Sequence, residues 1–145
     1  MGNSSIVSLP LTLTIRTESG WFNGERAQDL DFVNVKVTVP PAHRGSGIPY
    51  SHRMARADRF FTFADRTDYA NDRAFSAGLR KALSRQKPGE RDVMLYVHGY
   101  NNSFTDGVFR TVQLMHDFRL PGIGVHFSWP SAVHPLGYTY DRDSV

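Results

Sequence analysis

The sequence predicts an α/β fold, and three observations point to it. Two stretches with helical spacing of apolar residues occur between residues 71 and 127, and a short apolar run follows each of them. Strands that alternate with helices are typical of a mostly parallel sheet with crossover helices. Alternating valines farther upstream predict an antiparallel N-terminal edge of this sheet. The 145 residues suffice for one domain with a hydrophobic core.

The first 63 residues predict three strands. Residues 6–15, IVSLPLTLTI, are strand-like, but Pro10 interrupts them, which favours an edge strand or an irregular arm. Residues 32–39, FVNVKVTV, have valine at every second position and predict a strand with one apolar face. The prolines and glycines of PPAHRGSGIPY (40–50) end that strand, and RFFTF (59–63) predicts another short one.

The remaining elements alternate in type. Apolar residues at positions i, i+4, i+7 and i+8 predict an amphipathic helix over residues 71–83. VMLYV (93–97) has no alternation, which is typical of a strand buried on both faces. Apolar residues then recur at helical spacing, with Ser103 or Thr105 as the N-cap. IGVHF (123–127) predicts the next strand.

Composition excludes several classes of function. The chain has no cysteine, which excludes disulfides, thiolate metal sites and cysteine nucleophiles. No apolar run approaches the roughly 20 residues of a membrane helix, and the first residues are a poor secretory signal. The compartment is left open, with the cytoplasm as the default. The net charge of +3 is diffuse, with one cluster in residues 51–59 that we interpret as a solvated loop, so we expect no nucleic-acid partner.

The segment VMLYVHGYNNSF (93–104) carries the clearest functional signal, because a strand there ends in His98 and Gly99. Ligands bind at the carboxyl ends of parallel strands, and a glycine lets a reacting group approach the main chain. The N–H groups after Gly99 would then form an oxyanion hole, which receives the negative charge of an attacked carbonyl. From the residues alone, an ordinary strand-to-helix turn explains the segment equally well. We expect His98, Asn101 and Asn102 to brace the loop by hydrogen bonds rather than transfer protons.

Four motifs in this order resemble an uncharacterised bacterial family of α/β hydrolases: VHGYNNSF, FRTVQLMHDF, FSWPS and YTYDRDS, between residues 97 and 144. VKVTVPPAHRGSG (35–47) is similar to the N-terminal strand of the same family. The resemblance implies an esterase-like serine hydrolase that acts on ester or related acyl bonds of a small molecule, with a serine, an acid and a histidine in that chain order. It also implies that His98-Gly99 is the oxyanion loop and that the Tyr100 N–H is the donor.

The nucleophile is not evident in the sequence. The only Gly-Ser-Gly, residues 45–47, lacks the strand before it and the helix after it that a nucleophile turn needs. Ser128 and Ser131 follow a strand, but a tryptophan and a proline stand between them where the turn needs small residues. In the resembled family the nucleophile follows the next helix and strand. We therefore expect residues 1–145 to be the N-terminal part of a single hydrolase domain, inactive as written, with residues 1–20 as a candidate irregular arm and with the nucleophile, acid and base beyond Val145.

No histidine is assigned a catalytic or metal-binding role. The resemblance places the base last in the chain, so we interpret His116 and His126 as structural. The six histidines show no His-x-x-x-His spacing, and Asp65, Asp68 and Asp72 are interpreted as turn and helix-start carboxylates. The sequence implies no metal and no cofactor.

Two other hypotheses stay open. The chain could be a binding or interaction module that uses the same fold without catalysis, and an exposed strand edge would then favour self-association. Anion or nucleic-acid binding through Arg53, Arg56 and Arg59 is the second alternative. Three aromatic residues near the C-terminus are interpreted as core or interface packing rather than as a pocket lining: Trp129, Tyr138 and Tyr140.

Overall fold

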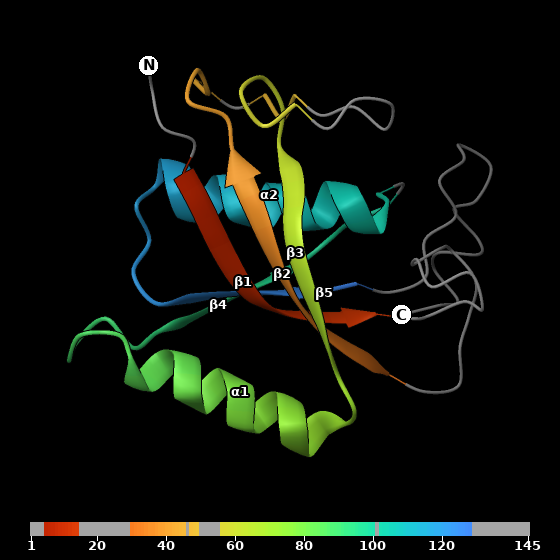
Figure 1. Ribbon diagram of the computed structural model, residues 1–145, viewed down its shortest axis with the longest axis vertical. Coiled ribbons are helices and arrows are strands. Elements are labelled where there is room, and N and C mark those ends of the chain that lie inside the picture. Colours follow the sequence, from red (N-terminus) through yellow and green to blue (C-terminus); the bar gives the residue numbers. More distant parts are fainter. Residues whose placement is uncertain (1–4, 15–29, 46, 50–55, 101, 129–145) are drawn as a thin grey trace.

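The computed structural model describes the main chain of residues 5–14 and all atoms of residues 30–45, 47–49, 56–100 and 102–128 (Figure 1). It contains one mixed sheet, with α1 and α2 on opposite sides of it. Within these ranges, neither helix has the length and apolar content that a bilayer crossing requires. The elements are β1 (Ser5–Thr14), β2 (Asp31–Val39), β3 (Thr62–Tyr69), α1 (Asp72–Ser84), β4 (Val93–Val97), α2 (Phe104–Asp117) and β5 (Ile123–Phe127).

The strand order confirms the α/β prediction. The sheet has the order β3-β2-β1-β5-β4. β2 is antiparallel to both β1 and β3, whereas β5 is parallel to both β1 and β4. Parallel neighbours need a crossover connection, and α2 provides it between β4 and β5. The antiparallel N-terminal part and the helix-connected parallel part are therefore both present, as the sequence predicts.

The edge position expected for the first strand is wrong. β1 lies in the middle of the sheet, between β2 and β5. Its register with β2 shifts between Leu9 and Thr12, so Pro10 lies at an irregularity of the ladder. A proline lacks the N–H of a regular ladder and is tolerated at a bulge, which allows β1 to occupy a central position.

β2 supplies one side of the main core, as predicted. Val33, Val35, Val37 and Val39 are each at most 2% exposed and pack against buried residues of α2. The second residue of β2, Phe32, stacks on Phe75 of α1, with ring centroids 5.2 Å apart. Alternate residues of this strand therefore contact the two helix layers.

β3 begins later and runs longer than RFFTF predicted. Phe61 precedes the strand and is buried in the core, whereas β3 itself continues through the charged residues up to Tyr69. Asp65 forms an ion pair with Lys36 of β2 at 2.9 Å, and Asp68 forms one with Arg66 at 2.6 Å. The interpretation of Asp65 and Asp68 as turn carboxylates is therefore wrong; both lie on a charged edge strand. Asp72, by contrast, does lie in the first turn of α1.

Both helices begin at side-chain caps. Asn71 caps α1 and accepts a hydrogen bond from the Ala74 N–H. Ser103 caps α2, and its hydroxyl accepts from the Asp106 N–H while the Asp106 carboxylate accepts from the Ser103 N–H. This reciprocal capping box satisfies two main-chain donors at the start of α2. The prediction of Ser103 as a cap is confirmed.

The prediction that β4 is buried on both faces is wrong for the described part of the chain. β4 is the last strand of the sheet, and Val93, Leu95 and Val97 are 45%, 58% and 52% exposed. Each lies opposite a β5 residue, and two of these, Ile123 and Val125, pack against α1. The exposed residues are therefore on the α1 side of the sheet, at an edge that α1 does not cover.

Candidate active site

The candidate site lies where two neighbouring parallel strands end. β4 ends at Val97 and leads into the loop with His98, Gly99 and Tyr100, while β5 ends at Phe127 and is followed by Ser128. Since β4 and β5 are parallel and in contact, their carboxyl ends lie side by side at the same end of the sheet. This is the position at which open α/β sheets bind ligands.

His98 links the two strand ends. Its side chain is buried, with Nδ1 2.9 Å from the Gly99 carbonyl oxygen and Nε2 3.3 Å from Ser128 Oγ. A carbonyl oxygen only accepts hydrogen bonds, so Nδ1 carries a proton and donates it to the Gly99 carbonyl oxygen. This arrangement places the imidazole of His98 between the loop after β4 and the end of β5.

The peptide between Gly99 and Tyr100 has its carbonyl oxygen bound from two sides. Besides His98, Asn102 donates to this oxygen through Nδ2 at 3.2 Å, and the same amide donates to the Tyr100 carbonyl oxygen at 2.9 Å. The described chain has no cis peptide bond, and in a trans peptide the N–H points opposite to the C=O. The Tyr100 N–H is therefore directed away from the His98 and Asn102 side chains.

The space beside this peptide is open. Gly99 is exposed, and a Cβ built on it would meet no atom of the described chain within 4 Å. Tyr100 is 40% exposed. A larger side chain at residue 99 would project into this space. Asn101, the third residue predicted to brace the loop, lies outside the described residues.

His126 packs against His98 of the His98-Gly99 loop. Its ring is fully buried, 5.6 Å from the His98 ring centroid, and Nδ1 lies 3.2 Å from the Tyr96 carbonyl oxygen. Burial, together with the neighbouring His98, lowers the pKa of His126 to about 3, although the hydrogen bond to Tyr96 opposes this shift. A neutral, buried imidazole of this kind acts as a packing group.

A close contact with α2 holds His126 in place. A Cβ added to Gly107 would lie 2.3 Å from both Cε1 and Nε2 of His126. The glycine therefore allows α2 to lie directly on the imidazole ring. His126 Nε2 has no hydrogen-bond partner among the described residues, which fits its position against the helix backbone.

The described residues do not provide an accessible nucleophile at this site. Ser128 is only 8% exposed, and its hydroxyl is engaged with His98. Ser131 lies outside the described residues, as do Trp129, Tyr138 and Tyr140. The Gly45-Ser46-Gly47 segment follows β2 rather than a parallel strand, and Ser46 is also outside the described residues.

The sequence motifs gave no role to Ser128 other than that of a disfavoured nucleophile. Its contact with His98 joins residues 30 positions apart, and only the β4–β5 register brings the two together. The FSWPS motif was the one sequence feature that could have indicated this contact, because it places Ser128 directly after the strand that pairs with β4.

The arginines proposed for anion binding are only partly described. Arg56 forms a two-pronged pair with Asp58, at 3.2 Å from Nε and 2.7 Å from Nη2. Arg59 is exposed, and Arg53 lies outside the described residues. The Arg56 charge is therefore balanced locally.

Comparison with known proteins agrees with this geometry. Residues 71–145, more than half of the 145-residue chain, match a family described as "Alpha/beta hydrolase of unknown function (DUF900)". The matched segment begins at the N-cap of α1 and includes the His98-Gly99 loop and both parallel strands that flank the candidate site. Searches among curated proteins and among solved structures gave no match. The chain belongs to this family of α/β hydrolases.

Proposed function

We propose that this chain supplies the oxyanion-hole side of a serine hydrolase that acts on ester or related acyl bonds of small molecules. The proposal depends on one observation above all. The Gly99 carbonyl oxygen accepts hydrogen bonds from His98 and Asn102, so the Tyr100 N–H of the same trans peptide points away from these two side chains. Membership of the α/β hydrolase family and the position at the ends of two parallel strands support the same assignment.

In the proposed reaction, a serine oxygen attacks the acyl carbon while a histidine accepts the serine proton. The carbonyl oxygen becomes negatively charged in the tetrahedral intermediate. The Tyr100 N–H donates a hydrogen bond to this oxygen, and His98 and Asn102 keep the peptide in the orientation that this requires. The histidine then returns the proton to the leaving alcohol, and the acyl-enzyme is hydrolysed by water. A single donor of this kind contributes a factor of about 10²–10³ to the rate.

The free edge of β4 is where we place the strand that carries the nucleophile. β4 is paired on one side only within the described sheet. A further strand that pairs in parallel with the other side of β4 would end beside the His98-Gly99 loop, because parallel strands have their carboxyl ends at the same end of the sheet. A turn of the Gly-x-Ser-x-Gly type after that strand would bring its serine to the Tyr100 N–H. We expect this segment, and the acid and base after it, to follow Val145.

Kinetics of a chromogenic ester test the proposal. We expect the 145-residue chain alone to show no turnover that a serine-directed phosphonate abolishes. The coding sequence beyond codon 145 should encode a Gly-x-Ser-x-Gly turn within the next strand–turn–helix unit, and its product should hydrolyse the ester. Phosphonate-sensitive turnover by the 145-residue chain would show that the nucleophile has been misplaced.

The role of the donor is tested within the extended protein. Replacing the Tyr100 amide by an ester removes the N–H and keeps the side chain, and we expect kcat to fall about 10²–10³-fold. The matched control is Tyr100→Phe, which keeps the N–H and should retain most of the activity. Equal effects of the two changes would contradict the oxyanion assignment.

A binding module is the second candidate function, and the exposed residues of β4 favour it. Val93, Leu95 and Val97 form an apolar strip on an edge strand, and such edges pair with other chains. A stop codon directly after Val145 would favour this alternative over the enzyme. The two candidates make opposite predictions for the same sequencing result.

A further inference from the structure

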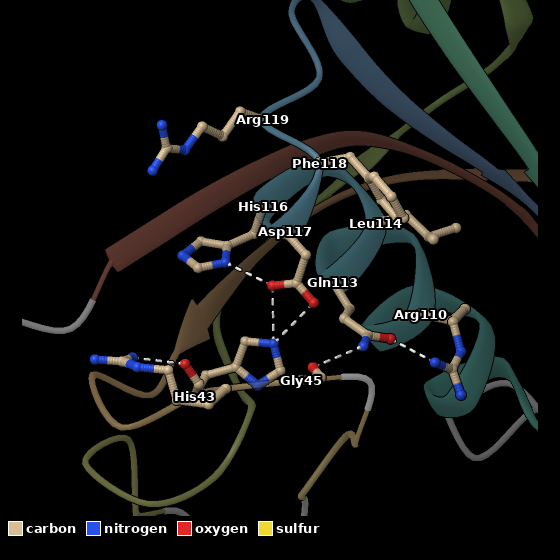
Figure 2. A pocket seen from close by; sticks show the side chains of 10 residues that line it. His43, Gly45, Arg110, Gln113, Leu114, His116, Asp117, Phe118 and Arg119 are labelled. Carbon is tan, nitrogen blue, oxygen red and sulfur yellow. Dashed lines mark hydrogen bonds and ion pairs between the residues drawn. The ribbon is translucent and has the colours of Figure 1, made fainter.

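We infer that His43, His116 and Asp117 form a binding site for a divalent transition-metal ion, of the class to which zinc belongs (Figure 2). The site lies at the C-terminal end of α2, whereas the His98-Gly99 loop precedes the N-terminal end of the same helix. A helix of 14 residues is about 20 Å long, so the two sites are separate. The inference goes beyond the proposed hydrolase activity and does not depend on it.

The donor atoms of the three residues are close together. His43 Nε2 lies 2.9 and 3.1 Å from the two carboxylate oxygens of Asp117, and His116 Nδ1 lies 3.0 Å from Asp117 Oδ1. One ligand atom from each residue lies within 4.8 Å of the others. Nitrogen and oxygen ligands bind zinc at about 2.0–2.2 Å, which places neighbouring ligand atoms roughly 3 Å apart. Small side-chain movements would therefore bring all three onto one ion.

The fold positions His43 with little freedom. The His43 N–H donates to the Pro40 carbonyl oxygen at 2.9 Å, in the turn that follows β2. The imidazole is buried and packs edge-on against Phe61, with ring centroids 5.0 Å apart. A ligand held in this way loses little conformational entropy when it binds an ion.

His116 and Asp117 complete the site from the last turn of α2. Their side chains are 36% and 27% exposed, so the ion can enter from solvent and water can fill its remaining positions. In Figure 2 the Asp117 carboxylate lies between the two imidazoles and is joined to each by dashed lines, and all three residues line a surface pocket of about 560 Å³. The C-terminal end of a helix carries partial negative charge, which adds to that of the Asp117 carboxylate in attracting a cation.

Three arginines also line the pocket, and each is directed elsewhere. Arg44 donates to the carbonyl oxygens of Pro41 and His43, and Arg110 donates to the Gln113 side chain. Arg119 extends away from the cluster in Figure 2. Their positive charge therefore does not occupy the space between the two imidazoles and the carboxylate.

A structural role is the competing explanation of the same contacts. His43 and Asp117 are 74 positions apart, and their hydrogen bond ties the loop after β2 to α2. A brace of this kind needs His43 and Asp117, and His116 adds to it only an exposed hydrogen bond to Asp117. A metal site needs all three residues, since two protein ligands rarely hold zinc. His116 therefore distinguishes the two explanations.

Calorimetric titration of the 145-residue chain with Zn²⁺, followed by the visible absorption spectrum with Co²⁺, tests the inference. We expect one ion per chain, with affinity lowered at least tenfold in both His116→Ala and Asp117→Asn. His116 is exposed, so His116→Ala should retain the circular dichroism spectrum of the parent chain. Glu90→Gln, which removes an exposed carboxylate in the turn before β4, is the control and should bind as the parent does.

Two results would overturn the inference. The first is no heat of binding and no Co²⁺ absorption band at millimolar metal. The second is metal binding that His116→Ala and Asp117→Asn leave unchanged, which would place the ion elsewhere. If Asp117→Asn alone unfolds the chain, the result for His116→Ala decides.

Discussion

At the scale of single residues, one contact determines how closely α2 approaches the sheet. The ring of His126 lies where a side chain at Gly107 would project, so the helix rests on the imidazole. The same histidine also contacts the ring of His98 in the His98-Gly99 loop. Packing at Gly107 and the position of the candidate active site are therefore linked through His126.

Gly107→Ala should destabilise the protein, although alanine is the better helix former. A Cβ at this position would lie 2.3 Å from two ring atoms of the fully buried His126. Overpacking of this kind costs about 1–3 kcal/mol, which outweighs the helix propensity gained. Urea unfolding followed by circular dichroism measures the change.

Gly78→Ala in α1 is the matched control. There the nearest atom is the Tyr69 hydroxyl, at the movable end of a half-buried side chain. We expect Gly78→Ala to destabilise much less than Gly107→Ala. Equal decreases in the free energy of unfolding for the two substitutions would contradict a specific effect of the His126 contact.

The buried His126 should make stability depend on pH. Its pKa in the folded protein is about 3, against 6.5 for an ordinary histidine, because burial and the neighbouring His98 disfavour its charged form. Between pH 3 and pH 6.5, His126 therefore binds a proton in the unfolded chain but not in the folded chain. This contribution is complete above pH 6.5 and is lost as the pH falls toward 3, at about 1.4 kcal/mol per pH unit.

Urea unfolding from pH 7 to pH 4 measures this dependence. His126→Gln keeps a hydrogen-bond donor but does not titrate. As the pH falls, the free energy of unfolding of this variant should therefore decrease less steeply than that of the parent, by a slope that corresponds to about one proton. Parallel curves for the parent and His126→Gln would contradict the assignment of a depressed pKa.

At the scale of elements, local periodicity in the sequence is enough to predict several features. The valines of β2, the helical spacing of α1 and the Ser103 cap are local patterns, and each matches the structure. β3 was misplaced because aspartate and alanine have low strand propensity, and the ion pair of Asp65 with Lys36 forms only after β3 pairs with β2. The central position of β1 also depends on distant partners, which Pro10 alone could not reveal.

The start of α2 offers an element-scale prediction. Ser103→Ala removes the hydroxyl that accepts from the Asp106 N–H, and the loss should be about 0.5–2 kcal/mol. The control is Ser84→Ala at the end of α1, where the hydroxyl donates to the Lys81 carbonyl oxygen and alanine is a good helix residue. Thermal unfolding of both variants checks the prediction. A loss from Ser84→Ala as large as that from Ser103→Ala would contradict a specific role of the cap.

At the scale of the whole molecule, the two edges of the sheet differ. β3 forms one edge and carries ion-paired charges, which oppose pairing with another sheet. β4 forms the other and exposes three apolar residues. Of the candidate site, the loop and its glycine were predictable from the sequence. The Ser128 contact and the grouping of His43 with Asp117 were not, because they join residues 30 and 74 positions apart.

The exposed edge predicts self-association of the 145-residue chain. Leu95→Lys places a charge in the middle of β4 and should lower the dimer fraction in sedimentation velocity at a given concentration. Leu30→Lys is the control, because Leu30 is 54% exposed, close to the 58% of Leu95, but lies next to β2. A parent chain that is monomeric at high concentration would contradict the prediction, as would equal effects of the two substitutions.

The most direct test of the oxyanion assignment observes the Tyr100 amide itself. A small alkyl phosphonate carries the negative oxygens that a tetrahedral intermediate would present, and it can be titrated into the ¹⁵N-labelled 145-residue chain. We predict that the Tyr100 amide proton resonance moves downfield and saturates, and that Gly99→Val, which fills the open side of the loop, abolishes the shift. A Tyr100 resonance that stays in place while the phosphonate reaches high millimolar concentration would contradict the account.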